Sequence, residues 1–188
     1  MNPRPAGGTR EHLFEATYRC IARSGLERTT VEDAAREAGV SRATVYRWFP
    51  GGREQLLHDT IAWETDQFFL RLAAEVADAE TFAEVVTRAI ISGRRWIAEH
   101  EVLQRLFATE AGQLVPAITD EMRRLVPAIG RFVEPYLVLE GVPDPAPAGE
   151  YVARVVVSHI ASPGRWDLGD PAQVEELVRT EVLAGLSL

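Results

Sequence analysis

The sequence predicts an all-α protein of about nine helices. Apolar side chains recur at the three- and four-residue spacing of a helix over most of the 188 residues, and no segment alternates with the two-residue period of a strand. Glycine, proline and N-capping residues separate these periodic segments. Hydrophobic residues make up 46% and charged residues 26% of the chain, which is typical of a globular protein with one or two domains.

Three short helices are expected near the N-terminus, after a tail rich in proline and glycine. The first covers about residues 10–24. Thr30 caps the second, which is about nine residues long and stops at Gly39. Ser41 caps the third, and Pro50 ends it. Two short helices joined by a tight glycine turn are typical of a helix-turn-helix motif.

The third of these helices has two different sides. Val45 and Phe49 are one turn apart and are expected to pack with Val40 in a small core. The remaining positions carry polar or small side chains that point elsewhere, namely Arg42, Ala43, Thr44, Tyr46 and Arg47.

The rest of the chain is expected to be helical with one clear loop. Helices are predicted over residues 53–77, 82–100, 102–109 and 148–161, and from Pro171 onward. Pro116, Pro127 and Pro135 leave the helix boundaries between residues 112 and 139 open, because each proline removes a backbone donor. The loop is expected over residues 141–149, which contain three prolines.

Charge is distributed unevenly along the chain. The net charge is −8. Residues 1–58 hold nine Arg and seven acidic residues, a balance of +2, whereas residues 59–188 hold eleven Arg and twenty-one acids, a balance of −10. The two parts are therefore expected to face different partners, the first of which can include phosphate groups.

Composition and motifs argue against several classes of function. The single cysteine excludes an internal disulfide and a zinc site built from several thiolates. The N-terminus has no apolar signal-peptide core and no run reaches the length of a membrane span, so a cytoplasmic protein is expected. No catalytic motif, phosphate-binding loop or metal-ligand spacing is found, and neither an enzyme nor a cofactor is predicted.

Residues 29–49 (TTVEDAAREAGVSRATVYRWF) and their continuation in residues 53–57 (REQLL) resemble the N-terminal signature of TetR-family transcriptional regulators. The resemblance implies a helix-turn-helix DNA-binding domain at residues 1–57 and a helical effector-binding and dimerisation domain at 58–188. Two positions depart from the family pattern. Ala34 replaces a larger aliphatic residue, and Arg53 stands where a phosphate-binding lysine is usual.

The same resemblance, together with helix position, implies the DNA contacts. Arg42 is expected to read a base, because its planar fork can bond guanine O6 and N7 together. Ala43 is small enough to meet a thymine methyl group. The other expected contacts are mainly to the DNA backbone, from Thr30, Thr44, Tyr46, Arg47, Trp48 and Arg53.

For the C-terminal part the resemblance implies a ligand cavity and a dimer surface. A largely apolar small molecule is expected, because the faces that would line the cavity carry few charged groups. The candidate lining residues are Trp63, Gln67, Trp96, His100, Gln104, Phe107, Met122 and Phe132. The last two helices are expected to pair with those of a second copy through Val152, Val155, Val156, His159, Val174, Leu177 and Val178. A homodimer would then read a two-fold operator, and the ligand would release it, which implies a repressor.

Two alternatives remain open at this point. One is a helical small-molecule-binding protein whose helix-turn-helix has lost its affinity for DNA. The other is an adaptor that uses its apolar C-terminal helices to bind an unlike protein partner. Salt-dependent duplex binding would exclude the first, and a dimer in sedimentation would exclude the second.

Overall fold

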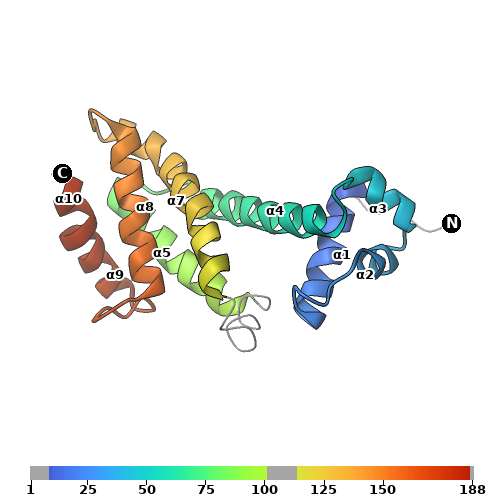
Figure 1. Ribbon diagram of the computed structural model, residues 1–188. Helices are drawn as coiled ribbons and strands as arrows, with labels where there is room; N and C mark the ends of the chain where they lie inside the picture. The colour runs from blue at the N-terminus through green and yellow to red at the C-terminus, as the bar shows by residue number, and fades with distance from the viewer. Residues whose placement is uncertain (1–8, 101–113, 187–188) are drawn as a thin grey trace. The chain divides into compact units, whose positions relative to one another are not determined.

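The computed structural model describes residues 9–100 and 114–186, with the side chains of 114–122 left aside. Within these ranges the regular elements are all helical, which confirms the all-α prediction. The chain divides into two compact units, and the described residues fall into 9–68 for the first and 69–100 with 114–186 for the second. Figure 1 shows the helices of each unit.

The first unit contains α1 (Thr9–Ser24), α2 (Val31–Glu37), α3 (Arg42–Trp48) and most of α4 (Gly52–Glu75). Its core is a cluster of small and medium apolar side chains around two large ones, Phe14 and Phe49. Val45 and Phe49 are fully buried, as their spacing predicts. The Phe14 ring lies 5.6 Å from that of Phe49 and 5.7 Å from that of Trp63, so α1, α3 and α4 meet at aromatic contacts.

Side-chain caps fix where the short helices begin. The Thr30 hydroxyl accepts from the Asp33 amide at 3.1 Å, and the Asp33 carboxylate accepts from the Thr30 amide at 3.2 Å, which forms a capping box. Ser41 caps α3 by accepting from the Thr44 amide at 3.2 Å. Helix α2 is shorter than predicted, with seven residues, because Ala38 is its C-cap and Gly39 follows with φ +65°.

The second unit is built from α5 (Phe82–Glu99), α7 (Leu114–Leu139), α8 (Pro145–Ala161), α9 (Pro171–Leu177), a π-helical segment η1 (Val178–Leu183) and α10 (Ala184–Leu186). Figure 1 shows α7 and α8 side by side. Its core is mostly aliphatic and includes Phe82, Val86, Ile90, Val133, Leu137, Val152, Val156, Leu168, Val174, Leu177, Val178 and Val182.

Two glycines let α7 and α8 approach closely. A Cβ atom added to Gly149 would lie 2.8 Å from the carbonyl oxygen of Gly130, closer than such atoms can come. A Cβ atom on Gly130 would lie 3.4 Å from its nearest neighbour, an ordinary contact. The helix crossing therefore depends on the missing side chain of Gly149 more than on that of Gly130.

The end of α4 is tied to α5 by polar contacts inside the second unit. Glu75 accepts from the hydroxyl of the buried Ser92 and from Arg95 Nη2 at 2.8 Å. Arg88 of α5 donates to the Glu75 carbonyl oxygen at 3.3 Å and pairs with Asp78. The last turn of α4 thus contacts α5 in two ways, through the Glu75 carboxylate and through the Glu75 backbone carbonyl.

Several predicted boundaries in the second unit need correction. The loop predicted over residues 141–149 is shorter, because α8 already begins at Pro145. Pro145 and Pro147 lie in the first turn, where the backbone amides have no intrahelical partner to lose. Helix α7 continues through Pro127 and Pro135, and the helix predicted over 102–109 lies outside the described residues.

A π-helical segment, η1, follows α9 and was not predicted. Tyr151 of α8 donates to the Glu181 carbonyl oxygen at 2.7 Å, so an acceptor within the widened turn is satisfied from a neighbouring helix. The same hydroxyl lies where a side chain on Gly185 would be, 1.8 Å from the position of its Cβ.

Among the described helices, none is both long and apolar enough to cross a membrane.

Candidate nucleic-acid interface

Helix α3 presents one side to the core and the other to solvent. Val45 and the C-cap residue Phe49 are buried in the core of the first unit. Two large aromatic side chains face outward, Tyr46 with 44% and Trp48 with 43% of their surface exposed. Arg42, Ala43 and Arg47 are exposed with them, and Thr44 is half-buried. A seven-residue helix with this outer face has the size and chemistry to enter the major groove of duplex DNA.

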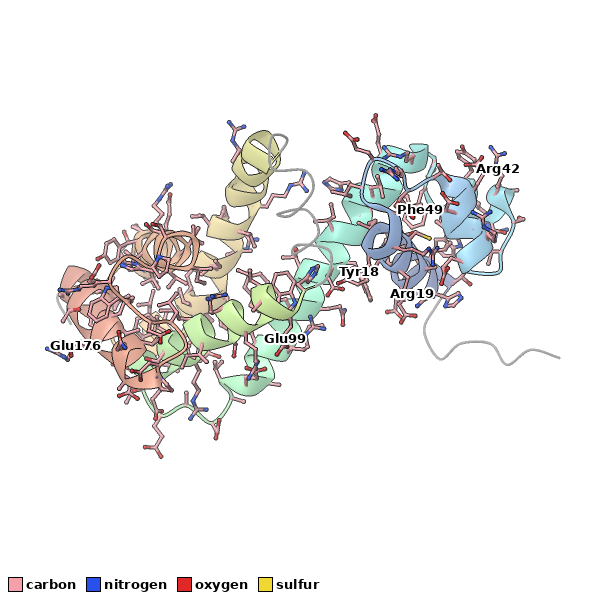
Figure 2. All side chains as sticks on the ribbon, turned by 90° about the horizontal axis from the view of Figure 1, so that it is seen from below. Tyr18, Arg19, Arg42, Phe49, Glu99 and Glu176 are labelled. Carbon is pink, nitrogen blue, oxygen red and sulfur yellow. The ribbon has the colours of Figure 1, made fainter. Side chains whose placement is uncertain are left out.

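Arg42 is held by a neighbouring helix. Its Nη2 atom lies 2.6 Å from Oε1 of Glu32 in the first turn of α2. Both side chains are solvent-exposed, and Figure 2 shows Arg42 at the edge of the first unit, whereas Phe49 lies among its helices. The sequence did not predict the role of Glu32, because its pairing with Arg42 depends on the angle between α2 and α3, and residue spacing within each helix does not give that angle.

The hydroxyl of Thr30 is committed to the capping box. It donates to Asp33 Oδ2 at 2.6 Å in addition to accepting from the Asp33 amide. These bonds with Thr30 lower the pKa of the Asp33 carboxyl below its usual range, and the nearby Arg36 adds to the effect. Thr30 therefore has a structural task at the start of α2, whatever it contacts on DNA.

Arg53 has partners within this chain that the sequence did not predict. Its Nε donates to the Thr29 carbonyl at 2.7 Å, and its Nη2 donates to the carbonyls of Leu26 at 2.6 Å and Glu27 at 3.0 Å. The guanidinium thus closes the turn between α1 and α2. Its predicted contact with phosphate stays a prediction, which the two N–H donors of Nη1 would have to make, because Nε and Nη2 already donate to these carbonyl groups.

Glu37 at the end of α2 forms a second link that the sequence did not reveal. It accepts from Arg19 Nε at 3.0 Å and from Arg23 Nη1 at 3.2 Å, both on α1. The hydrogen bonds from Arg19 and then Arg23 lower the pKa of the Glu37 carboxyl. The capping box, Arg53 and Glu37 together hold α2 at both ends, so the turn that supports α3 is fixed.

Comparison with known proteins identifies this motif. The model of the family described as "Bacterial regulatory proteins, tetR family" matches residues 13–60, which span most of α1, all of α2 and α3, and the start of α4. Residues 13–60 therefore form a TetR-type helix-turn-helix segment. The TetR resemblance carried by residues 29–57 is thereby confirmed.

Similar proteins extend beyond the matched segment. The uncharacterized HTH-type transcriptional regulator Rv1255c of Mycobacterium tuberculosis is 26% identical over 171 residues, or 89% of this chain and 82% of that protein. The structure of the TetR-family repressor AlkX from Dietzia has a TM-score of 0.59 at 22% identity and covers 95% of this chain and 96% of its own. FadR from Bacillus subtilis, solved with stearoyl-CoA, has a TM-score of 0.56 at 18% identity and covers 90% and 97%. The whole chain therefore has a TetR-like fold.

The predicted ligand residues that the structure describes belong to separate clusters. Trp63 is partly buried and packs on Phe14 of the first unit, and Gln67 follows one turn later on α4. In the second unit, the rings of Trp96 and His100 lie 4.4 Å apart. Phe132 instead lies between Phe69 and Tyr136, with ring centroids 5.7 and 6.0 Å away. Gln104, Phe107 and the side chain of Met122 lie outside the described residues.

His100 has the most perturbed environment among these candidates. Only 8% of its surface is exposed. Burial lowers the pKa of its imidazole to about 4, and the positive charge of Arg71 lowers it further. The ring is therefore neutral near pH 7, which suits contact with an apolar or uncharged group.

Most of the predicted dimer residues lie inside the protomer, which is a correction. Five of them are at most 6% exposed and belong to the core of the second unit: Val152, Val156, Val174, Leu177 and Val178. Val155 and His159 are partly exposed. His159 lies 3.0 Å from Glu181, whose other carboxylate oxygen accepts from the Trp166 indole at 3.0 Å. These residues stabilise the protomer.

Proposed function

We propose that this chain is a DNA-binding transcriptional repressor that acts as a homodimer and is released from its operator by a small molecule. The observation that supports the proposal most strongly is the two-sided α3. Its buried side fixes the helix to the unit, and its outer side carries Arg42, Tyr46 and Trp48 in exposed positions. A cytoplasmic location goes with this function, because the operator is there.

Dimerisation follows from the small size of the reading helix. Seven residues reach too few base edges for strong specificity, so two copies must read two half-sites. We assign the dimer surface to the outward side of α8, where Arg154, Ser158 and Ala161 are exposed and Val157 is partly exposed. The recognition helices of the pair then lie about 34 Å apart, or a multiple of that distance, to enter successive major grooves.

For the effector we propose an apolar or acyl compound. Support comes from the aromatic groups near α5 and α7, from the neutral state of His100, and from the titles of similar structures. The repressor AlkX is implicated in biodegradation of n-alkanes, and FadR was solved with stearoyl-CoA. Another similar structure, from Saccharomonospora viridis, contains choline, so a small cation is the competing class.

Duplex binding by the purified protein tests the proposal. We expect a sequence selected from random duplexes to bind the dimer, and the logarithm of affinity to fall linearly with the logarithm of salt concentration, with a slope of about −0.9 per phosphate contact. The position of Arg53 keeps one alternative open, a small-molecule-binding protein with a degenerate helix-turn-helix, because three of the five guanidinium donors are used by carbonyl groups of this chain. Absence of duplex binding at 50 mM salt would establish that alternative.

Thermal denaturation with added compounds tests the effector class. Stearoyl-CoA, long-chain alkanes and choline are compared at equal concentration. We expect the acyl or alkane compounds to raise the melting temperature and to weaken duplex binding, since a ligand that prefers the DNA-free state shifts the population toward it. Stabilisation by choline alone would contradict the apolar assignment.

A further inference from the structure

Three acidic residues of α2 have three different tasks. Asp33 forms the capping box with Thr30 and pairs with Arg36, and Glu37 binds Arg19 and Arg23 of α1. Both of these acids therefore stabilise α2 or its attachment. Glu32 instead reaches α3 and lies 2.6 Å from Arg42.

The position of Glu32 is unfavourable for general DNA affinity. Its side chain is 48% exposed beside the face of α3 that we assign to DNA, where a carboxylate repels phosphate groups. The pair is too exposed to contribute much to folding, since such pairs are worth little in water. As an acid in the first turn of α2, Glu32 favours the start of that helix, but this role does not require its contact with Arg42.

We propose that Glu32 is a positioning residue that determines specificity by holding Arg42 for guanine. The proposal rests on the proposed DNA-binding function. The guanidinium has five N–H donors, and contact of Nη2 with one carboxylate oxygen leaves the outer edge of the fork available. That edge matches the O6 and N7 acceptors of guanine. A side chain already held in place loses less freedom when it binds.

The same contact penalises the wrong base. Where guanine is absent, Arg42 remains paired with Glu32, because turning to a nearby phosphate would break that pair. Non-specific binding then lacks one favourable contact and retains one repulsive charge. Glu32 is thus expected to raise the ratio of specific to non-specific affinity, although it lowers affinity for random DNA.

The experiment compares matched variants on three duplexes. The wild-type protein first selects its preferred duplex from a random pool. Fluorescence anisotropy then measures binding to that duplex, to a copy with the guanine opposite Arg42 replaced, and to a random duplex. The variants are Glu32→Gln, Arg42→Ala and the double substitution. Glu11→Gln on α1 is the control, because it removes the same charge at another exposed position.

For Glu32→Gln we expect tighter binding to random DNA and a two- to fivefold smaller preference for guanine, about the effect of one exposed ion pair. In the Arg42→Ala background the substitution no longer changes the guanine preference. The inference is overturned if Glu32→Gln changes that preference no more than Glu11→Gln does, or if it acts equally with and without Arg42. If the wild-type protein selects no duplex, the proposed DNA-binding function fails together with this inference. If it selects a duplex but the effect of Glu32→Gln does not depend on Arg42, only this inference fails.

Discussion

The guanidinium of Arg53 donates hydrogen bonds to three carbonyl oxygens of the turn between α1 and α2. Removing it leaves those acceptors without their partner, so we expect Arg53→Ala to lower the free energy of unfolding by about 1–3 kcal/mol. Urea denaturation followed by circular dichroism measures the change. Because the side chain is committed to the protein, the salt slope of duplex binding is expected to stay the same.

Arg47→Ala is the matched control for this residue. Arg47 is exposed on α3, and its removal is expected to leave stability unchanged while reducing the salt slope by about one phosphate contact. The reverse pattern, a reduced slope and normal stability for Arg53→Ala, would establish Arg53 as a phosphate-binding residue.

His100 makes stability depend on pH in a defined direction. Its pKa is lowered from 6.5 to about 4 in the folded chain. The unfolded state therefore binds more protons between these values, and stability falls as pH drops from 6.5 toward 4, with no effect above 6.5. We expect His100→Gln to show a smaller loss of stability between pH 7 and pH 5 than wild type, measured by urea denaturation. An equal loss in both proteins would show that His100 is not the group responsible, and His58→Gln, at an exposed histidine, serves as control.

At the residue scale, the sequence predicted which side chains are buried but not which part of the structure buries them. Val45 and Phe49 were placed correctly because the core around α3 is local. Val152, Val156 and Val174 form an equally regular pattern, yet the partner that buries them is their own protomer. Arg53 and Glu32 could not be assigned from spacing, because their partners are 24 and ten residues away on other elements.

The contact between α7 and α8 depends on Gly149. A methyl group there would lie 2.8 Å from the Gly130 carbonyl oxygen, so the helices must separate. We expect Gly149→Ala to lower the free energy of unfolding by about 1–3 kcal/mol, the usual effect of overpacking. Gly130→Ala is the control, since its methyl group fits and alanine favours helix, and it is expected to be neutral or slightly stabilising. Equal effects of the two substitutions in thermal denaturation would contradict this asymmetry.

The prolines explain why element boundaries were harder to predict than element types. Pro127 and Pro135 are exposed on α7, and so are Arg123 and Arg131, the residues whose carbonyls lose a partner. Water can therefore bond to these carbonyls, and the helix continues. The η1 segment had no sequence signal either, because Val178 and Val182 keep ordinary helical spacing while the turn between them widens.

The assembly state of the whole molecule is testable through the outward side of α8. Val157 is partly exposed there and is absent from the core of the second unit. We expect the 20.8 kDa chain to sediment as a dimer and Val157→Glu to sediment as a monomer, because a buried carboxylate without a partner opposes association. Ala98→Glu on α5 adds the same charge at an exposed position and is expected to remain dimeric. A monomeric wild-type protein would favour the adaptor alternative.

Helix α4 is anchored near each end to a different set of neighbours. Arg53 at its start donates to the turn that leads into α2, and Glu75 at its end accepts hydrogen bonds from Ser92 and Arg95 of α5. The two ends of α4 therefore belong to different compact units, and each unit makes its own hydrogen bonds to the helix.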